Sequence, residues 1–342
     1  MKKLASAVFG KLRSTRVVAA LVVLGVLGTV PFVARVQGQS LFEALIKQSG
    51  VVSGNKNPLQ IALLHWYNAN LSTTFSVPSS PYGMAFDGQN IWVANNGSGK
   101  ITKIRANDGA NLGSFNVGTS PTGVAFDGAN IWVANINSGN VTKLQASTGS
   151  VLGTFTVGTQ PVGIMFDGAN IWVTNNGSGN VTKLKATTGA VLGTFPAGTF
   201  PAAVAFDGTN IWIANNGSAN VTKMSPTGAV LGTFPVGSQP GGIAFDGTNM
   251  WVANFGSNNV TELSLTGAVL GTFAAGLGPS GIVYDGQNIW VTDFNSTKVT
   301  KLLASTGANA GTFTVGGEPV AAAFDGANIW VSNFSSGTVS KL

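Results

Sequence analysis

The feature that most constrains this chain is a repeat of 39 or 40 residues that occurs seven times. Each copy opens with a proline and contains a Phe-Asp-Gly step, or Tyr-Asp-Gly in the sixth copy, with a tryptophan six residues after the aromatic residue. The opening prolines are Pro81, Pro121, Pro161, Pro201, Pro240, Pro279 and Pro319. The tryptophans are Trp92, Trp132, Trp172, Trp212, Trp251, Trp290 and Trp330. A fixed period of this length, with several short strands per copy, predicts an all-β fold, the seven-bladed β-propeller.

The third copy illustrates how one repeat becomes one blade. Its four predicted strands cover residues 163–166, 171–175, 181–184 and 191–195. The Asp-Gly and Thr-Gly pairs between them are typical of hairpin turns, because glycine readily adopts positive φ. The second strand is apolar on both faces, which predicts burial between neighbouring blades. We therefore assign its tryptophan to the core between blades.

The two ends of the repeat array predict how the ring closes. The seventh copy stops after its third strand, whereas residues 74–77, before the first copy, match the outer-strand residues 154–157 of the second. Both segments lie at the same distance from the next opening proline. We expect the upstream segment to complete the seventh blade as its outer strand, because this pairing removes two open sheet edges.

Residues 1–38 are expected to direct export. A basic start ending at Arg16 precedes an uncharged run over residues 17–33, and a candidate cleavage point lies before Gln39. This pattern is typical of a cleaved signal peptide or of a retained signal anchor. Positive charge stays on the cytoplasmic side of a membrane, so both alternatives predict an extracytoplasmic protein that is periplasmic, at the cell surface or secreted. We expect membrane contact only through this segment, if it is uncleaved.

Residues 39–69 are interpreted as a short helical preface to the propeller, which we assign to residues 70–342. Asn57-Pro58 with Gln60 is typical of a helix start, and apolar residues follow at helical spacing. We expect this amphipathic helix to pack on the propeller.

The distribution of charge excludes one class of partner. The net charge of +6 arises outside the repeats, because residues 70–342 carry ten basic and eleven acidic side chains. A nucleic-acid-binding domain concentrates basic charge on its folded surface, so we expect no nucleic-acid partner. The chain has no cysteine, which excludes disulfides and thiolate metal sites.

Two charged residue types recur near the face that carries the Asp-Gly turns. The aspartates are Asp87, Asp127, Asp167, Asp207, Asp246, Asp285 and Asp325. The lysines are Lys103, Lys143, Lys183, Lys223, Lys301 and Lys341, with Glu262 at the equivalent position of the fifth copy. We interpret the aspartates as turn residues rather than cation ligands, and we expect the lysines to form exposed ion pairs with them. No metal site and no cofactor is predicted.

The opposite face, formed by the turns after the second strands and the links between blades, varies from copy to copy. Variation on a fixed scaffold is where recognition tends to occur. The candidate ligand-binding residues on this face are Phe200, Phe255, Phe294, Phe334, Asp293 and Glu318. Exposed aromatic side chains are favoured anchors, so we expect a surface that binds a protein or a glycan. The alternative is that these rings fold inward and cap the central channel.

The tetrad Trp172-Val-Thr-Asn175 and its counterparts follow an Asp-Gly turn. Over roughly residues 70–342 the chain resembles bacterial YVTN-type propeller repeats, with Trp in place of the usual Tyr. The resemblance implies an exported β-propeller, and many such proteins have no assigned activity. More distantly the copies resemble streptogramin lyases, which use a propeller histidine as general base. No copy here contains a histidine, so the resemblance does not extend to that activity.

These observations favour a non-catalytic, exported binding or scaffold propeller of the cell envelope, which recognises a protein or glycan through its variable face. We assign no catalytic residue, although enzymatic activity stays open. One alternative is an envelope hydrolase or lyase that uses Asp293 and Glu318, since a glycosidase needs two carboxylates at a defined separation. The near-identical blades suggest a third possibility, a structural surface component.

Overall fold

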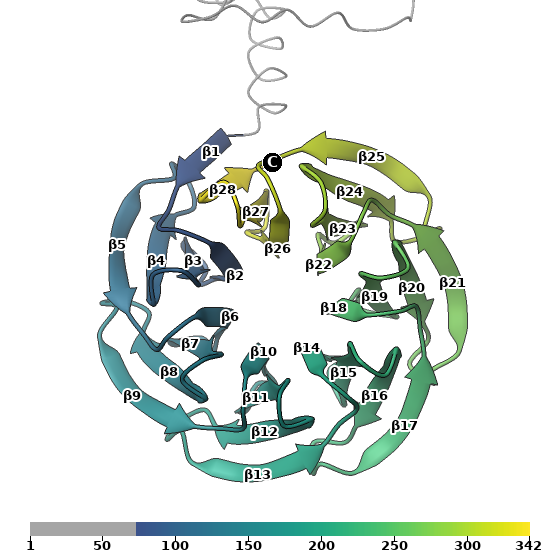
Figure 1. Ribbon diagram of the computed structural model, residues 1–342, viewed down its shortest axis with the longest axis horizontal. Coiled ribbons are helices and arrows are strands. Elements are labelled where there is room, and N and C mark those ends of the chain that lie inside the picture. Colours follow the sequence, from purple (N-terminus) through teal and green to yellow (C-terminus); the bar gives the residue numbers. More distant parts are fainter. Residues whose placement is uncertain (1–72) are drawn as a thin grey trace, which may run out of the picture. The chain divides into compact units, whose positions relative to one another are not determined.

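The computed structural model describes residues 73–342. The expected signal or anchor segment (1–38) and helical preface (39–69) lie outside the described residues. Residues 73–342 form 28 strands in seven four-stranded sheets, arranged as blades around a central opening (Figure 1). The predicted seven-bladed, all-β architecture is therefore confirmed. Within this part of the chain, no helix is long and apolar enough to cross a membrane.

The strands of each blade are given below in order from the central opening outward. Blades 1 to 3 contain β2 (Pro81–Phe86), β3 (Asn90–Asn95), β4 (Lys100–Arg105) and β5 (Asn111–Asn116); β6 (Pro121–Phe126), β7 (Asn130–Asn135), β8 (Asn140–Gln145) and β9 (Val151–Thr156); and β10 (Pro161–Phe166), β11 (Asn170–Asn175), β12 (Asn180–Lys185) and β13 (Val191–Pro196). Blades 4 and 5 contain β14 (Pro201–Phe206), β15 (Ile211–Asn215), β16 (Asn220–Met224) and β17 (Val230–Pro235); and β18 (Pro240–Phe245), β19 (Met250–Asn254), β20 (Asn259–Leu263) and β21 (Val269–Ala274). Blades 6 and 7 contain β22 (Pro279–Tyr284), β23 (Asn288–Asp293), β24 (Lys298–Leu303) and β25 (Asn309–Thr314); and β26 (Pro319–Phe324), β27 (Ile329–Asn333), β28 (Thr338–Lys341) and β1 (Thr73–Ser76).

Blade 3 confirms the four strands predicted for the third copy, each extended by one or two residues. Strand β11 is buried from Ile171 to Asn175, because neighbouring blades cover both of its faces. The hairpin between β10 and β11 turns at Gly168, whose φ of +96° is accessible to glycine. The inner strand is irregular after Pro161, as expected where a proline without an N–H starts a strand.

The tryptophans form the core between blades. Trp172 is fully buried and packs against Ile211, Ile213 and Met224 of the next blade. Within its own blade, its ring lies 5.8 Å from the ring of Phe195 on the outer strand, measured between centroids. The same Trp–Phe contact recurs in every blade, at 5.0–5.8 Å.

Blade 7 is built from both ends of the described chain, as expected. Strand β1 pairs antiparallel with β28, from Thr73 opposite Lys341 to Ser76 opposite Thr338. Phe75 stacks on Trp330 at 5.5 Å, which reproduces the Trp–Phe contact of the continuous blades. The ring is therefore closed by β1.

Candidate functional site

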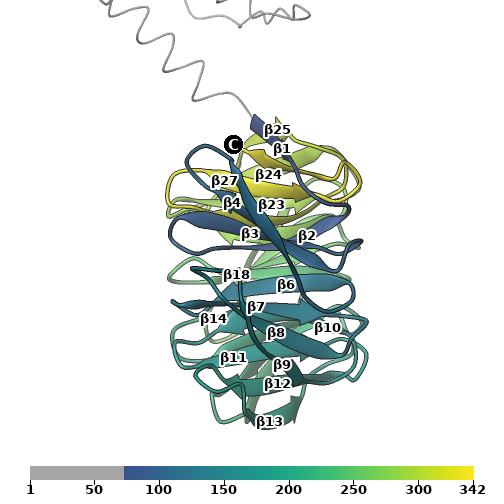
Figure 2. The same ribbon diagram turned by 90° about the vertical axis from the view of Figure 1, so that its left-hand side faces the viewer.

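Turns and links gather at two opposite faces of the propeller (Figure 2). On one side, the turn after β11 contacts the link that precedes its own blade: the Asn176 N–H donates to Gln160 O at 2.9 Å and the Gly177 N–H donates to Thr159 O at 3.1 Å. We call this side the variable face. On the other side, the first and third turns meet, where the Ala186 N–H donates to Ala169 O. The predicted division of turns between the two faces is correct.

Away from the variable face, the repeated aspartates stabilise their own turns. Asp167 accepts hydrogen bonds from the N–H groups of Ala169 and Asn170 and, at 2.7 Å, from Trp172 Nε1. Burial opposes ionisation of this carboxyl, but these hydrogen bonds hold the pKa of Asp167 below its usual value. The tryptophans of all seven repeats donate to a turn aspartate in this way. The interpretation of these aspartates as turn residues is confirmed.

The expected lysine–aspartate ion pairs do not form. Lys183 Nζ lies 5.1 Å from the centroid of the Trp172 ring and donates at 2.8 Å to Pro226 O in the third turn of the next blade. All six lysines of the set lie over their own tryptophan. The prediction of lysine–aspartate ion pairs was wrong because the carboxylates already accept hydrogen bonds from the tryptophan and turn N–H groups. The face of the indole ring also attracts the ammonium group.

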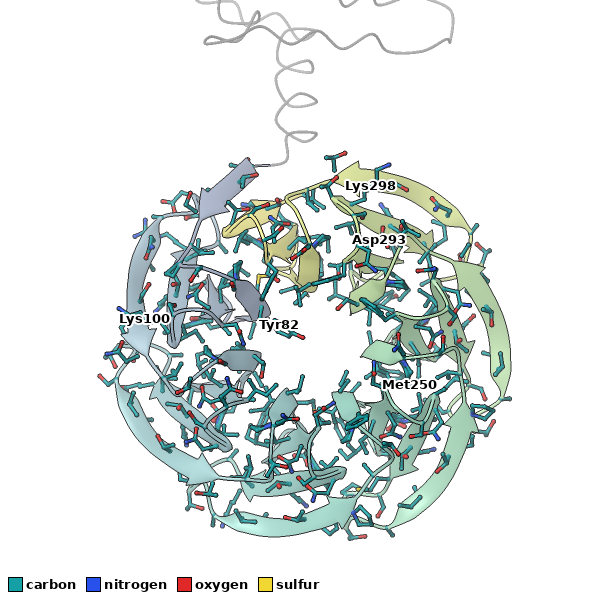
Figure 3. The ribbon with its side chains drawn as sticks, in the orientation of Figure 1. Tyr82, Lys100, Met250, Asp293 and Lys298 are labelled. Atoms are coloured by element: carbon teal, nitrogen blue, oxygen red, sulfur yellow. The ribbon has the colours of Figure 1, made fainter. Side chains whose placement is uncertain are left out.

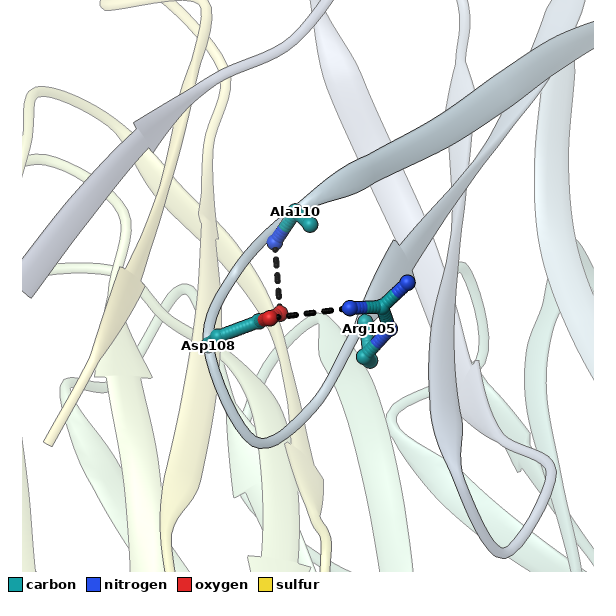
Figure 4. A network of polar contacts seen from close by, with 3 residues as sticks. All are labelled: Arg105, Asp108 and Ala110. Atoms are coloured by element: carbon teal, nitrogen blue, oxygen red, sulfur yellow. Dashed lines mark hydrogen bonds and ion pairs between the residues drawn. The ribbon is translucent and has the colours of Figure 1, made fainter.

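Among residues 73–342, one ion pair has its charged atoms within 4 Å of each other: Arg105 and Asp108, at 3.0 Å (Figure 4). It lies in the third turn of blade 1, where Asp108 also accepts the Ala110 N–H. Both charged side chains are about half exposed (47% and 49%), so the pair adds little stability. In the same part of the chain, no three His, Cys, Asp or Glu side chains gather into a group that could hold a metal ion.

A buried asparagine stabilises the turn of the variable face in six blades, and in blades 2 to 4 it also accepts a hydrogen bond from the preceding link. This role was not expected from the sequence. Asn175, at the end of β11, donates to Asn180 Oδ1 and Thr182 Oγ1, while its Oδ1 accepts the Gly158 N–H of the preceding link. The side chain therefore ties three segments together. Asparagine occupies this position in six blades, at Asn95, Asn135, Asn175, Asn215, Asn254 and Asn333. Its regular recurrence was the available signal.

Asp293 takes the place of this asparagine in blade 6 (Figure 3). It is 1% exposed, and its two carboxylate oxygens accept the Gly276 N–H at 3.0 Å and the Thr300 hydroxyl at 2.8 Å. Burial raises the pKa of Asp293 to about 6. Asp293 is one of the predicted ligand-binding residues, but it lies beneath the variable face, because strand β23 is buried along its length.

The residue before each opening proline presents a variable side chain in a fixed conformation. The six non-glycine residues at this position have φ between 51° and 57°. They are Ser80, Ser120, Gln160, Phe200, Gln239 and Glu318. Residues other than glycine rarely adopt this left-handed backbone conformation, because it costs conformational free energy. On this face the blades therefore differ in the side chain at this position but share its backbone conformation.

Apolar side chains concentrate on blades 4 to 7 of the variable face. Phe200 is 51% exposed and its ring lies over Gly217, where an added Cβ would come within 2.6 Å. Phe255 and Phe294 are half-buried and pair with ring centroids 5.9 Å apart. Phe334 is also half-buried and meets Tyr82 edge to face at 6.3 Å. Tyr82 lies beside the central opening (Figure 3).

Leu277 is a member of this surface that the sequence analysis missed. At 59% it is among the most exposed large apolar side chains of the described residues. Five other links carry Ser or Thr at this position: Ser79, Thr119, Thr159, Thr199 and Ser238. Comparing links position by position was therefore the signal that could have found it. We define the apolar arc as Phe200, Phe255, Leu277, Phe294 and Phe334, with the half-buried Glu318 between blades 6 and 7.

No protein-family model and no curated protein sequence matches the chain. Among solved structures, it is similar to a hydrazine synthase from Kuenenia stuttgartiensis, with 18% identity and a TM-score of 0.71 over 79% of this chain and 97% of that one. It is also similar to a streptogramin B lyase, with 19% identity and a TM-score of 0.69 over 79% of this chain and 96% of that one. The likeness shows the fold. At such identities it transfers no activity, because one propeller scaffold serves many functions.

Proposed function

We propose that this protein is an exported binding or scaffold propeller of the cell envelope, whose apolar arc recognises a protein or a glycan. The YVTN-like tetrads and the basic, then apolar, start of the sequence support export. A seven-bladed propeller is compatible with such a role, since its face presents many variable side chains on a rigid base.

The observation that carries the proposal is the clustering of exposed apolar side chains on one sector of the variable face. Phe200 and Leu277 are 51% and 59% exposed, although no other link places an apolar side chain larger than glycine at these positions. Exposed apolar clusters on a soluble domain commonly mark interaction sites. The half-buried Phe255–Phe294 pair lies on blades 5 and 6, which the Leu277 link connects, and provides a rigid aromatic base, as is favoured in binding hot spots.

A matched pair of variants tests the proposal. We expect Phe200→Ser combined with Leu277→Ser to weaken the capture of envelope proteins or immobilised glycans by about tenfold or more, because both apolar anchors are lost. The control is Leu303→Ser, which removes a 39% exposed leucine at the end of β24 away from this face. Equal capture by the double variant and the control would contradict the proposal.

The half-buried rings separate binding from the capping alternative. Replacing Phe255, Phe294 and Phe334 with Ser should abolish capture while leaving the melting temperature nearly unchanged, if their main role is binding. A large fall in the melting temperature would instead assign these rings to closing the central channel.

The hydrolase or lyase alternative has less support. It needs both Asp293 and Glu318, but Asp293 is 1% exposed and both of its oxygens are hydrogen-bonded within the blade. The structural similarity to a streptogramin B lyase concerns the fold. An activity that survives Asp293→Asn but not Glu318→Gln would revive an enzyme with a single acidic residue.

A further inference from the structure

The outer rim of the propeller carries an apolar surface that the proposed function does not use. The outermost strand of each blade is an edge strand, paired on one side only (Figure 1). In blades 2 to 5 this strand begins with Val-Leu, and these eight side chains are 51–54% exposed. They are Val151, Leu152, Val191, Leu192, Val230, Leu231, Val269 and Leu270.

These four edges lack most of the features that usually protect an open strand. None of β9, β13, β17 and β21 contains a charged residue. Pro196 and Pro235 end two of the strands, at the opposite end from the Val-Leu pair. Natural sheets guard exposed edges with charges, prolines or kinks because unprotected edges pair with other strands.

The two flanking blades do carry such a feature. In blade 1, Asn111 stands where blades 2 to 5 have Val, and its Oδ1 accepts the Gly113 N–H at 2.9 Å. Gly113 has a φ of 133°, so the strand is kinked and this N–H is not free to pair. Blade 6 repeats the arrangement: Asn309 accepts the Gly311 N–H at 2.8 Å, and Gly311 has a φ of 144°.

The four intervening blades have Val at this position and no such kink. Their equivalent glycines are outside the positive-φ region. These glycines are Gly153, Gly193, Gly232 and Gly271. All six of these outer strands have a register shift against the third strand beside this position, so the asparagine–glycine kink is what distinguishes the flanking edges. Kinked edges on both sides of four apolar edges define a bounded surface along the rim.

We propose that the outer strands of blades 2 to 5 pair edge to edge with the same strands of a second copy of this chain. Two identical strands that pair antiparallel around a two-fold axis match in length and side-chain pattern. Because the strands are uncharged, no like charges oppose each other across the pair. The described residues carry ten basic and eleven acidic side chains, so repulsion between copies is weak.

Several equivalent edges on one molecule have a further consequence. A single edge would limit association to a dimer, whereas four neighbouring edges allow one copy to contact more than one other. Association can then continue beyond the dimer, because each two-fold contact uses one edge of each copy and leaves the other edges unpaired.

The test transplants the protective asparagine into the full chain. The variant Val151→Asn/Val191→Asn/Val230→Asn/Val269→Asn introduces the arrangement seen in blades 1 and 6. In sedimentation velocity over a concentration series, we expect the unaltered chain to associate, and the four-asparagine variant to show a dissociation constant raised about tenfold or more. In hydrogen exchange, outer-strand amides of the unaltered chain should gain protection with concentration, and those of the variant should not.

The reciprocal variant, Asn111→Val/Asn309→Val, exposes two more edges and should strengthen association. It also decides the question if the four-asparagine variant does not melt cooperatively. An unaltered chain that stays monomeric throughout the series overturns the proposal, even if its edges capture a strand of another protein. So does association that is equal in all three chains, because the contact would then lie elsewhere on the chain.

Discussion

At the scale of single residues, internal repetition supplies its own controls, because a departure in one blade can be compared with six equivalents. Asp293 is the clearest departure: a carboxylate lies where the other blades bury an amide. Its Oδ1 keeps the contact with the link, accepting the Gly276 N–H as Asn215 Oδ1 accepts the Gly198 N–H. The geometry is conserved and the charge is new.

The charge makes the contribution of Asp293 to stability depend on pH. Its folded-state pKa of about 6 lies above the ordinary value of 3.8, so the folded protein holds the proton more tightly than the unfolded chain does. The associated stabilisation is complete below about pH 4 and is lost as the pH rises through 6.

We therefore expect Asp293→Asn to raise the free energy of unfolding by about 2–3 kcal/mol at pH 8 and to change it little at pH 4. Blade 1 already combines this asparagine with a lysine five residues on, at Asn95 and Lys100, so the replacement has a precedent. Urea unfolding at the two pH values measures the effect. The reciprocal control, Asn215→Asp, should destabilise at pH 8; a gain from Asp293→Asn that is the same at both pH values would contradict the account.

Glu262 is the second departure, at the lysine position of blade 5. It accepts a hydrogen bond from Asn249 Nδ2 at 2.7 Å, and burial, with the nearby Asp246, raises its pKa. In blade 4 the equivalent Lys223 lies over Trp212 and donates to Leu265 O in the next blade. Blade 5 lacks this bridge.

We expect Glu262→Lys to stabilise the protein by about 1 kcal/mol, because the lysine can lie over Trp251 and donate to Ala304 O. Glu262→Gln removes the charge without supplying the bridge and should gain less. Thermal unfolding at pH 7 distinguishes the two. Equal gains would show that removal of the half-buried negative charge, rather than the bridge between blades, is responsible.

At the scale of elements, each outer strand is fixed by an aromatic ring that also receives a turn from the next blade. Phe75 of β1 stacks on Trp330, and an added Cβ on Gly109, in the third turn of blade 1, would overlap its ring. Phe313 of β25 makes the equivalent contact with Trp290, with the rings tilted by 42°, but no third turn of the described chain follows it in blade 7. These two rings therefore differ in the contact that joins one blade to the next.

We expect Phe75→Ala to lower the free energy of unfolding by about 3 kcal/mol, since it removes both the stack and the contact that closes the ring. Phe313→Ala is the matched control and should cost about half as much, because this ring is 36% exposed. Urea unfolding followed by tryptophan fluorescence measures both. Equal losses would mean that closure by β1 adds no stability of its own.

At the scale of the whole molecule, the period of the sequence predicted most of the fold. The recurring Trp172 position, the Asp-Gly turns and the match between residues 74–77 and 154–157 sufficed for the number of blades and their closure. A repeat determines which positions are equivalent. It does not determine which neighbouring group each side chain contacts in the folded blade.

The candidate site was less predictable for this reason. Lys183 and Asp167 recur near the same face, but the choice of an indole ring and a carbonyl over a carboxylate depends on distances within the folded blade. The exposure of Leu277 and the burial of Asp293 depend likewise on backbone direction at the end of a strand. The contacts between each link and the turn of the same blade were equally unpredictable: Phe200 lies over Gly217, whereas Gly278 lies against Asn295.

The pairing of β1 with β28 in blade 7 makes the first and last strands of the propeller essential to its stability. In most domains the outermost residues fray and can be trimmed at little cost. Here β28 is held between β27 and β1, so losing either β1 or β28 would open blade 7 rather than shorten a tail. Terminal residues, which most domains can lose without unfolding, are therefore required for the fold of this propeller.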